Sequence, residues 1–236
     1  MVLPRTAVAW LASALLLCAR PFPLAAQEDP SEQLGTWLQY FGDNRISDHV
    51  SIHTEAEYWL WEAASNPEVL ILRPAVNFHL NDGPFFSLGY TYVKSWPFHE
   101  EGARTTQNHF FQQLILRSPM WRFRLYHRYR FEERWIRANE ATETDFSTRL
   151  RYMLFLQLPL TRRTIEPNTL FLASYNELFV NTSGREAVFD QDRVYAALAY
   201  QVTRNMCVHT GFLWQIFSDR TLRRLQSAIF FNLDLR

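Results

Sequence analysis

Hydrophobic and polar residues alternate one by one along much of the chain, and this two-residue period is typical of a β-strand with two unlike faces. The clearest example runs from Met120 to Trp135, where every second residue from Arg122 onward is charged or polar and the residues between are mostly aromatic or aliphatic. A helix would mix these two sets on each of its faces. The pattern therefore predicts an extended strand with one charged face and one apolar face.

The same alternation predicts several further strands, each bounded by polar or turn-forming residues. Their expected ranges are 50–61, 68–80, 84–96, 107–117, 146–160, 168–181, 193–203, 206–217 and 225–236. A shorter segment, Leu34 to Gly42, has the same character and is a candidate for one more strand.

The connections between these strands alternate in length. Tight turns are expected at 81–83, 118–119 and 204–205, and long polar connections at 97–106, 136–145 and 182–192. Outer-membrane barrels alternate in this way between short periplasmic turns and longer outer loops. If the chain ends in the periplasm, all of these tight turns fall on the periplasmic side.

These observations predict an all-β fold, an antiparallel up-and-down transmembrane β-barrel of about ten strands, with twelve as the alternative if two strands have been merged. The segment Phe123 to Phe131 would cross about 20 Å of the membrane normal, close to the apolar band of such barrels. Because bacterial single-chain barrels have even strand numbers, Leu34 to Gly42 is left outside the count. The predicted barrel domain covers residues 50–236, and residues 27–49 form an N-terminal segment with one short strand.

Residues 1–26 have the features of a secretory signal peptide. Arg5 precedes the apolar run Ala7 to Ala19, and the small residues Ala25 and Ala26 precede the expected cleavage point. The apolar run is too short to span a bilayer, which needs about 20 residues. We therefore expect export to the outer membrane, where lipid would be the partner of the barrel. The periplasm is the alternative location. Because a cysteine, Cys18, lies in this segment, a lipidated protein is a further interpretation.

Composition narrows the class of protein. Aromatic residues make up 16% of the chain and hydrophobic residues 47%, yet the mean hydropathy is −0.23 because the apolar residues are dispersed among charged ones. This dispersal argues against a helical membrane protein. The 24 basic residues balance the 24 acidic ones, so the total charge indicates no nucleic-acid partner.

Cys207 is the one cysteine left after signal cleavage, and a single cysteine excludes a disulfide within the mature chain. The oligomeric state does not follow from the composition.

Short motifs are spread over nearly all of the mature chain. They are Leu72-Arg73-Pro74 with Asn81-Asp82, Gln112-Gln113-Leu114, Tyr175-Asn176-Glu177-Leu178-Phe179, Phe189-Asp190-Gln191-Asp192-Arg193 and Phe231-Asn232-Leu233-Asp234-Leu235. Together they resemble the bacterial family known as domain of unknown function 2490, with Tyr-Asn-Glu followed by Phe-Asp-Gln as the most specific element. The resemblance implies an exported β-barrel-like protein with no established activity. Its motif residues are Arg73, Pro74, Tyr175, Asn176, Glu177, Phe189, Asp190 and Gln191.

The charged strand faces supply the candidate binding residues. The basic set is Arg117, Arg122, Arg124, Arg128, Arg130, Arg134, Arg149 and Arg151. The acidic residues expected to share the interior are Glu55, Glu57, Glu177 and Asp234. This distribution predicts a basic wall facing a more acidic one, whose charges pair across a narrow lumen. The expected role is structural or binding; a narrow channel or binding site for small anionic solutes is the alternative.

Catalysis and metal binding have weaker support. No His-Glu-x-x-His spacing occurs, and the nearest ligand cluster, His99-Glu100-Glu101, lies in a polar connection. Serines and histidines are present without a Gly-x-Ser-x-Gly elbow. We expect no metal, no cofactor and no enzymatic activity, while a lipid-acting outer-membrane enzyme and a soluble periplasmic ligand-binding β-barrel remain alternatives.

Overall fold

The structure is a computed structural model, and it describes residues 29–80, 83–99, 104–138, 141, 143–184 and 186–236. The predicted signal peptide lies outside the described residues, as do Asn81 and Asp82 of one predicted turn. The described residues contain no helix long and apolar enough to cross a membrane.

The alternating segments form strands, as the two-residue period predicts. In chain order they are β1 (Leu34–Arg45), β2 (Val50–Leu60), β3 (Pro67–His79), β4 (Phe85–Ser95), β5 (Thr105–Met120), β6 (Phe123–Ala138), β7 (Asp145–Pro159), β8 (Thr169–Ser183), β9 (Phe189–Gln201), β10 (Met206–Ile216) and β11 (Thr221–Phe231).

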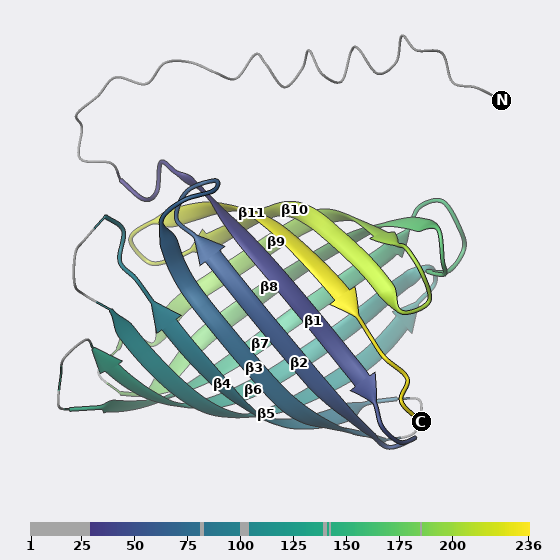
Figure 1. Cartoon of the computed structure of the whole chain (residues 1–236), viewed down its shortest axis with the longest axis horizontal. Helices are drawn as coiled ribbons and strands as arrows, with labels where there is room; N and C mark the ends of the chain where they lie inside the picture. The colour runs from purple at the N-terminus through teal and green to yellow at the C-terminus, as the bar shows by residue number, and fades with distance from the viewer. Residues whose placement is uncertain (1–28, 81–82, 100–103, 139–140, 142, 185) are drawn as a thin grey trace, which may run out of the picture.

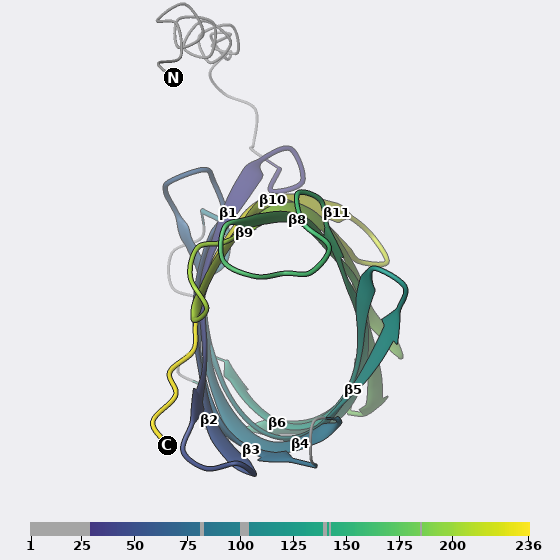
Figure 2. The ribbon, with the colours of Figure 1, turned by 90° about the vertical axis from the view of Figure 1, so that its right-hand side faces the viewer.

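These strands close into one barrel, which Figure 2 shows end-on. Each strand pairs antiparallel with its neighbours in sequence, while β1 and β11 close the ring as a parallel pair, from Leu34 opposite Arg223 to Phe41 opposite Phe230. The predicted all-β barrel is therefore confirmed.

The expected number of about ten strands needs correction. Leu34–Arg45 is a 12-residue strand that is hydrogen-bonded to β2 on one side and β11 on the other, so the barrel begins there and not at Val50. The even-number rule holds for barrels that close antiparallel. When the first and last strands run in the same direction, as β1 and β11 do, an odd number closes the ring.

The parallel closure gives the barrel two distinct ends (Figure 1). At the C-terminal end, where β11 finishes, lie the connections 46–49, 80–84, 121–122, 160–168 and 202–205. At the N-terminal end, where β1 starts, lie the connections 61–66 and 217–220; β4, β6 and β8 end there, and β5, β7 and β9 begin there. The predicted tight turn at 204–205 falls at the C-terminal end, whereas the one predicted at 118–119 is wrong, because β5 continues to Met120 and the chain turns at 121–122. The predicted long connections join strands at the other end, and 160–168 is a long connection at the end of the tight turns.

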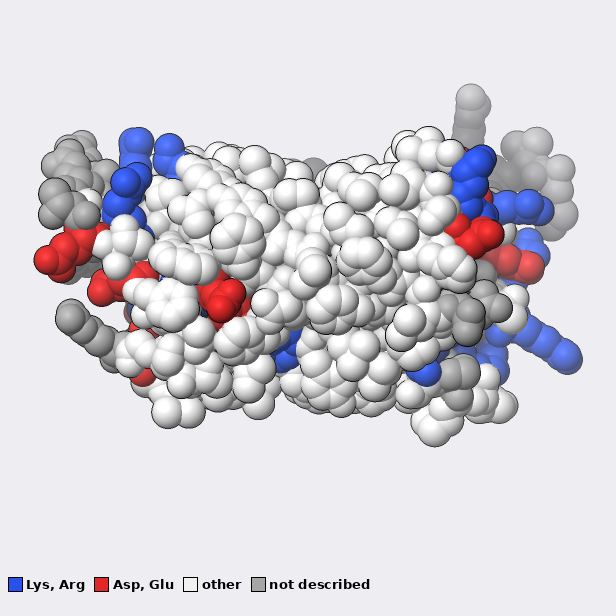
Figure 3. Space-filling view, turned by 90° about the horizontal axis from the view of Figure 1, so that it is seen from below, with Lys and Arg blue, Asp and Glu red and all other residues white. Residues whose placement is uncertain are grey.

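Residues facing the lumen are buried and mostly polar, whereas residues on the outer face are apolar and exposed. Leu72, Leu88, Phe110, Leu198 and Phe212 stand on different strands and are 45%, 46%, 53%, 55% and 51% exposed. Figure 3 shows that charged side chains are few on one side of this belt and that most of them gather at the two ends of the barrel. The barrel therefore has the opposite polarity to a soluble domain, in which apolar side chains fill the interior.

Candidate functional site

Two cavities occupy the described part of the lumen. The C-terminal cavity has a volume of about 380 Å³ and the N-terminal cavity one of about 560 Å³. Four charged residues border both cavities, and we call them the mid-lumen layer: Glu57, Arg73, Arg151 and Arg193. This layer lies where the two cavities approach each other.

Strand register brings the charged side chains together. Glu177 on β8 is opposite Arg193 on β9, and Arg130 on β6 is opposite Arg151 on β7. Because directly opposed residues point to the same face of a sheet, each of these pairs enters the lumen together.

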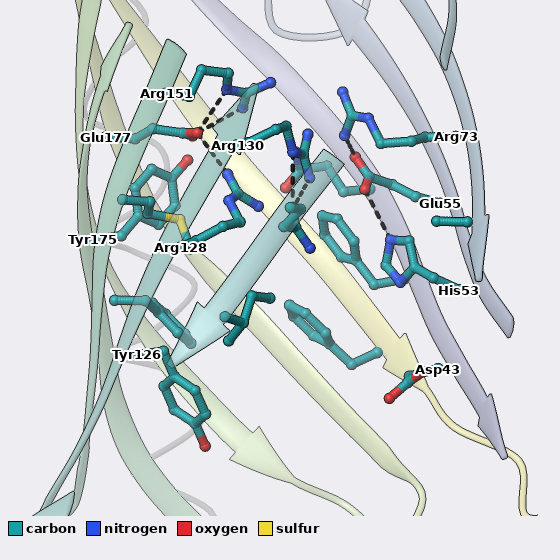
Figure 4. Close-up of a pocket in the computed structure, with 18 of the residues that line it drawn as sticks. Asp43, His53, Glu55, Arg73, Tyr126, Arg128, Arg130, Arg151, Tyr175 and Glu177 are labelled. Atoms are coloured by element: carbon teal, nitrogen blue, oxygen red, sulfur yellow. Dashed lines mark hydrogen bonds and ion pairs between the residues drawn. The ribbon is translucent and has the colours of Figure 1, made fainter. Parts of the chain in front are cut away.

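Glu177 binds two arginines from different strands. Its Oε1 atom accepts a hydrogen bond from Arg128 Nη2 at 2.6 Å and one from Arg151 Nε at 2.8 Å. Figure 4 shows both guanidinium groups turned toward this carboxylate. Glu177, expected among the interior acids, thus pairs with two arginines of the predicted basic set, Arg128 and Arg151.

Glu132 is a second centre of the network and is fully buried. One carboxylate oxygen accepts from Arg149 Nε at 2.9 Å and Nη2 at 2.6 Å, and the other accepts from Arg151 Nη1 at 2.7 Å. Arg130 Nη1 lies 3.7 Å away. The sequence analysis omitted Glu132 from the interior acids, although its position on the arginine face of the strand was the available signal.

Glu55 and Glu57 form a third group around Arg73. Arg73 Nη1 pairs with Glu55 and lies 3.4 Å from Glu57 Oε1. Glu57 Oε2 also accepts from Gln39 Nε2 at 2.6 Å and from Trp59 Nε1 at 2.9 Å. These acids are therefore held by β1, β2 and β3, so the expected pairing of a basic wall with an acidic wall across the lumen is wrong for them.

Arg193 crosses the middle of the lumen without a carboxylate partner among the described residues. Its guanidinium lies 4.9 Å from the Trp37 ring centroid, 5.1 Å from Trp59 and 4.6 Å from Phe179. Trp37 and Trp59 stack on each other with centroids 3.7 Å apart. Cations are attracted to aromatic faces in this geometry, so Arg193 joins β9 to β1, β2 and β8.

Three predicted arginines lie away from this network. Arg122 Nη2 donates to the Pro159 carbonyl at 2.9 Å and Arg124 Nη2 to the Ile165 carbonyl at 3.5 Å, so both hold the connection 160–168. Arg117 lines the C-terminal cavity. These three residues stand at or near the end of the barrel, where the strands leave the network.

Two further predicted charges have local partners. Arg134 Nη1 contacts Asn181 Oδ1 at 3.3 Å and Glu186 Oε2 at 3.0 Å near the N-terminal end. Asp234 is exposed on the C-terminal tail and not in the lumen, because β11 ends at Phe231. Hydrogen bonds from Arg236 lower the pKa of Asp234 to about 2.

The family-motif residues divide between the two faces. Arg73 and Glu177 belong to the ion-pair network described above. Three more have lumen or rim contacts: Tyr175 Oη donates to Gln226 at 3.0 Å, Arg149 Nη1 to Asp190 at 2.6 Å and Gln215 Nε2 to Gln191 at 2.7 Å. The exposed members are Pro74, Asn176 and Phe189, of which Asn176 donates to Asp192 Oδ1 at 2.7 Å.

One serine and histidine pair lies at the C-terminal end of the lumen. Ser51 Oγ is 2.8 Å from His79 Nε2 and also bonds the Asp43 carboxylate. In a catalytic triad the acid instead binds the far nitrogen of the histidine, and here the serine is fully buried. The geometry therefore favours a structural contact over a nucleophile.

Metal-ligand geometry is absent from the described residues, which hold no group of three or more suitable side chains. His99 Nε2 contacts Glu62 Oε1 at 3.0 Å, and Glu100 and Glu101 of the candidate cluster lie outside the described residues. A hydrogen bond from Ser65 is the largest of the effects that lower the pKa of Glu62.

Comparison with known proteins supports the resemblance seen in the motifs. The chain is 26% identical over 207 residues to an uncharacterized protein of Methylorubrum extorquens, and the alignment covers 84% of this chain and 85% of that protein. No solved structure matches the chain. The profile of the family described as "Protein of unknown function (DUF2490)" matches residues 34–226, from the first residue of β1 into β11. With most of its length covered by that match, the chain belongs to the DUF2490 family.

Proposed function

We propose that the protein is an outer-membrane β-barrel whose lumen is closed at the mid-lumen layer, and that it serves as a binding or structural barrel and not as an open pore. The reversed polarity of the barrel carries the proposal. Leu198 and Phe212 are more than half exposed on the outside, whereas Glu132 and Arg224 are fully buried inside. Such a molecule is stable where lipid covers its outer face.

A soluble periplasmic barrel is the alternative that this polarity disfavours. Exposed apolar side chains lie on every side of the ring, including Tyr58 on β2, Phe110 on β5 and Leu198 on β9. Apolar area left in water costs about 25 cal/mol per Å², and soluble monomers rarely expose contiguous apolar patches beyond a few hundred Å². Lipid as the partner accounts for a belt that continues around the barrel.

The ion-pair network supports closure of the lumen. Arg151 reaches two carboxylates, Glu132 and Glu177, and Arg193 on β9 lies against aromatic rings of β1 and β8. Buried charges of this kind are stable only when each keeps its partners, so the network favours a lumen that stays closed at this layer. A binding or structural role therefore fits the interior better than free diffusion of solutes.

A narrow anion channel is the second candidate, and the charge balance favours it over a cation channel. Among the described residues that line the two cavities there are nine arginines and six carboxylates. An excess of fixed positive charge attracts anions into a pore. Under this alternative the mid-lumen layer would open.

Two measurements test the proposal. The native protein should fractionate with the outer membrane and resist extraction by carbonate; recovery in the soluble periplasmic fraction would contradict the membrane assignment. Purified protein inserted into planar bilayers should give no conductance steps. Regular anion-selective steps would instead favour the channel.

A further inference from the structure

The C-terminal cavity has two chemically different halves. Toward the middle of the barrel it is bordered by arginines, including Arg128 and Arg130. Toward the C-terminal end its wall is mainly apolar and borders Asp43 and Arg117; the apolar side chains come from five strands and are Phe41, Phe85, Ile115, Met153, Phe155 and Phe230. The close-up in Figure 4 shows Arg128, Arg130 and Arg151 on one side of this space and Tyr126 further toward the end of the barrel.

Positive charge is in excess at the inner half. Arg128 and Arg151 share the Glu177 carboxylate, and Arg193 has no carboxylate partner among the described residues. The side chain of Arg128 is 17% exposed, more than those of Arg130 or Arg151, so it is the guanidinium that the cavity reaches best.

Arg130 carries an unused donor at this place. It is 3% exposed, and its Nε and Nη2 atoms donate to Gln113 Oε1 at 2.9 and 2.6 Å. Its Nη1 atom lies 3.7 Å from Glu132 Oε1, within ion-pair distance, but has no hydrogen-bond partner among the described residues, and neither has Nε of Arg128. Buried polar groups are normally satisfied, so unpaired donors beside a cavity mark a position for an acceptor that enters from outside the chain.

The apolar half is built mainly from aromatic side chains. Phe41 and Phe230 stack with centroids 4.8 Å apart, and the His209 ring lies 4.5 Å from Phe230 and 6.5 Å from Phe155. These rings offer dispersion contacts to an apolar occupant. A free inorganic anion would use only the arginines and would leave the wall in contact with water.

We propose that the C-terminal cavity binds an amphipathic monoanion, with its carboxylate at Arg128 and Arg130 and its aromatic or aliphatic body against the Phe41, Phe155 and Phe230 wall. Guanidinium groups bind carboxylates by charge-assisted hydrogen bonds. The volume of about 380 Å³ falls in the range of small-molecule sites. The inference rests on the proposed function because a lumen closed at the mid-lumen layer turns this space into a dead-ended pocket.

The test uses the whole barrel in lipid nanodiscs, since detergents are themselves amphiphiles. Isothermal titration, with empty nanodiscs subtracted, compares 2-naphthoate, the neutral 2-naphthalenemethanol and inorganic phosphate. We expect naphthoate to bind, and the alcohol and phosphate to bind at least tenfold more weakly. Equal binding of the alcohol, or of phosphate, would overturn the assignment of a charged head and an apolar body.

Variants locate the site. Arg128→Gln should weaken naphthoate binding tenfold or more, and Met153→Trp should abolish it by filling the cavity without changing charge. Arg137→Gln is the matched control, because Arg137 is an exposed arginine of the same strand that borders neither cavity. Binding that survives Met153→Trp, or that is lost equally in the Arg137 variant, would place the ligand elsewhere.

The outcome is separable from that of the proposed function. A barrel that inserts into membranes, conducts no ions and still fails to bind naphthoate would refute the ligand assignment alone. A protein that remains soluble, or that conducts, would refute the proposed function whatever it binds.

Discussion

Arg151 holds Glu177 by two nitrogens, with Nε at 2.8 Å and Nη2 at 2.7 Å from the same carboxylate oxygen. The same guanidinium extends its third nitrogen to Glu132 at 2.7 Å. One arginine thus links two buried carboxylates on the strands at either side of its own. Because buried ion pairs are stable only when each charge keeps its partners, this linkage makes Glu177 a sensitive position.

Replacing Glu177 by glutamine should lower the free energy of unfolding by about 3 to 5 kcal/mol, since Arg128 and Arg151 would lose their shared carboxylate. Arg128→Gln in the same chain should restore part of that loss. Unfolding by denaturant, followed by the shift in gel migration between folded and unfolded barrel, measures both variants. Glu166→Gln is the control: its ion pair with Arg162 is about half exposed, so a change of about 0 to 1 kcal/mol is expected.

Glu57 and Arg128 should behave as independent sites. Glu57 is held by Arg73, Gln39 and Trp59, so Glu57→Gln and Arg128→Gln should have additive effects to within about 0.5 kcal/mol. The same denaturant titration gives the coupling energy. A coupling of 1 kcal/mol or more, on the order of that expected for contacting residues, would contradict the pairing described here.

Cysteine labelling should separate a membrane barrel from a soluble one. In a Cys207→Ser background, cysteines at Leu198 and Phe212 should resist aqueous thiol reagents in intact membranes, although both positions are more than half exposed in the isolated chain. The reason is that lipid covers the outer face of a transmembrane strand. Cysteine at exposed Arg137 is the aqueous control. Rapid labelling at all three positions would contradict the membrane proposal.

The alternation predicted most of the fold and the side on which most of the charges lie. On β6 it placed Arg128, Arg130 and Arg134 on one face, and in the structure all three side chains enter the lumen or its rim. Period alone fixes a face because a strand reverses its side chains at every residue. It does not fix which charge meets which, since that depends on the stagger between strands that are distant in sequence.

The contacts that the sequence analysis missed are between strands whose relative stagger the alternation does not fix. Arg224 donates to Glu68 at 2.9 Å across β1 and β2, but Arg224 precedes the predicted final strand, which was placed too late in the chain. The tail also alternates, so Asp234 was expected inside, whereas Leu235 N instead bonds the Arg45 carbonyl beyond the end of β1. The search for pairs of opposite charges did not identify Arg193 as a lumen residue, because its partners there are aromatic rings and not carboxylates.

The two ends of the barrel chain should lie on opposite sides of the membrane. β1 and β11 are parallel, so the start of β1 and the end of β11 are at opposite ends of the barrel. We expect an epitope inserted after Pro30 and one added after Arg236 to differ in antibody access on intact cells, with the C-terminal one requiring permeabilised cells. An epitope inserted at 217–220 should be accessible to antibody on intact cells, as the one after Pro30 is. An epitope inserted at 160–168 should require permeabilised cells, as the one after Arg236 does. Equal access of both terminal epitopes would exclude this topology.

Arg193 is the residue whose loss should open the lumen. It borders both cavities and lies against Trp37, Trp59 and Phe179, so shortening it to alanine removes a side chain that joins β9 to β1, β2 and β8 at the mid-lumen layer. Loss of the cation–π contacts should cost about 1 to 2 kcal/mol, which leaves the barrel folded. We expect Arg193→Ala to produce conductance steps in planar bilayers that the parent protein lacks. Arg220→Ala is the control, because Arg220 makes a similar contact with Phe217 at the exposed N-terminal end. A folded Arg193 variant that stays silent would mean that the ion pairs around Glu132 and Glu177 close the lumen without it.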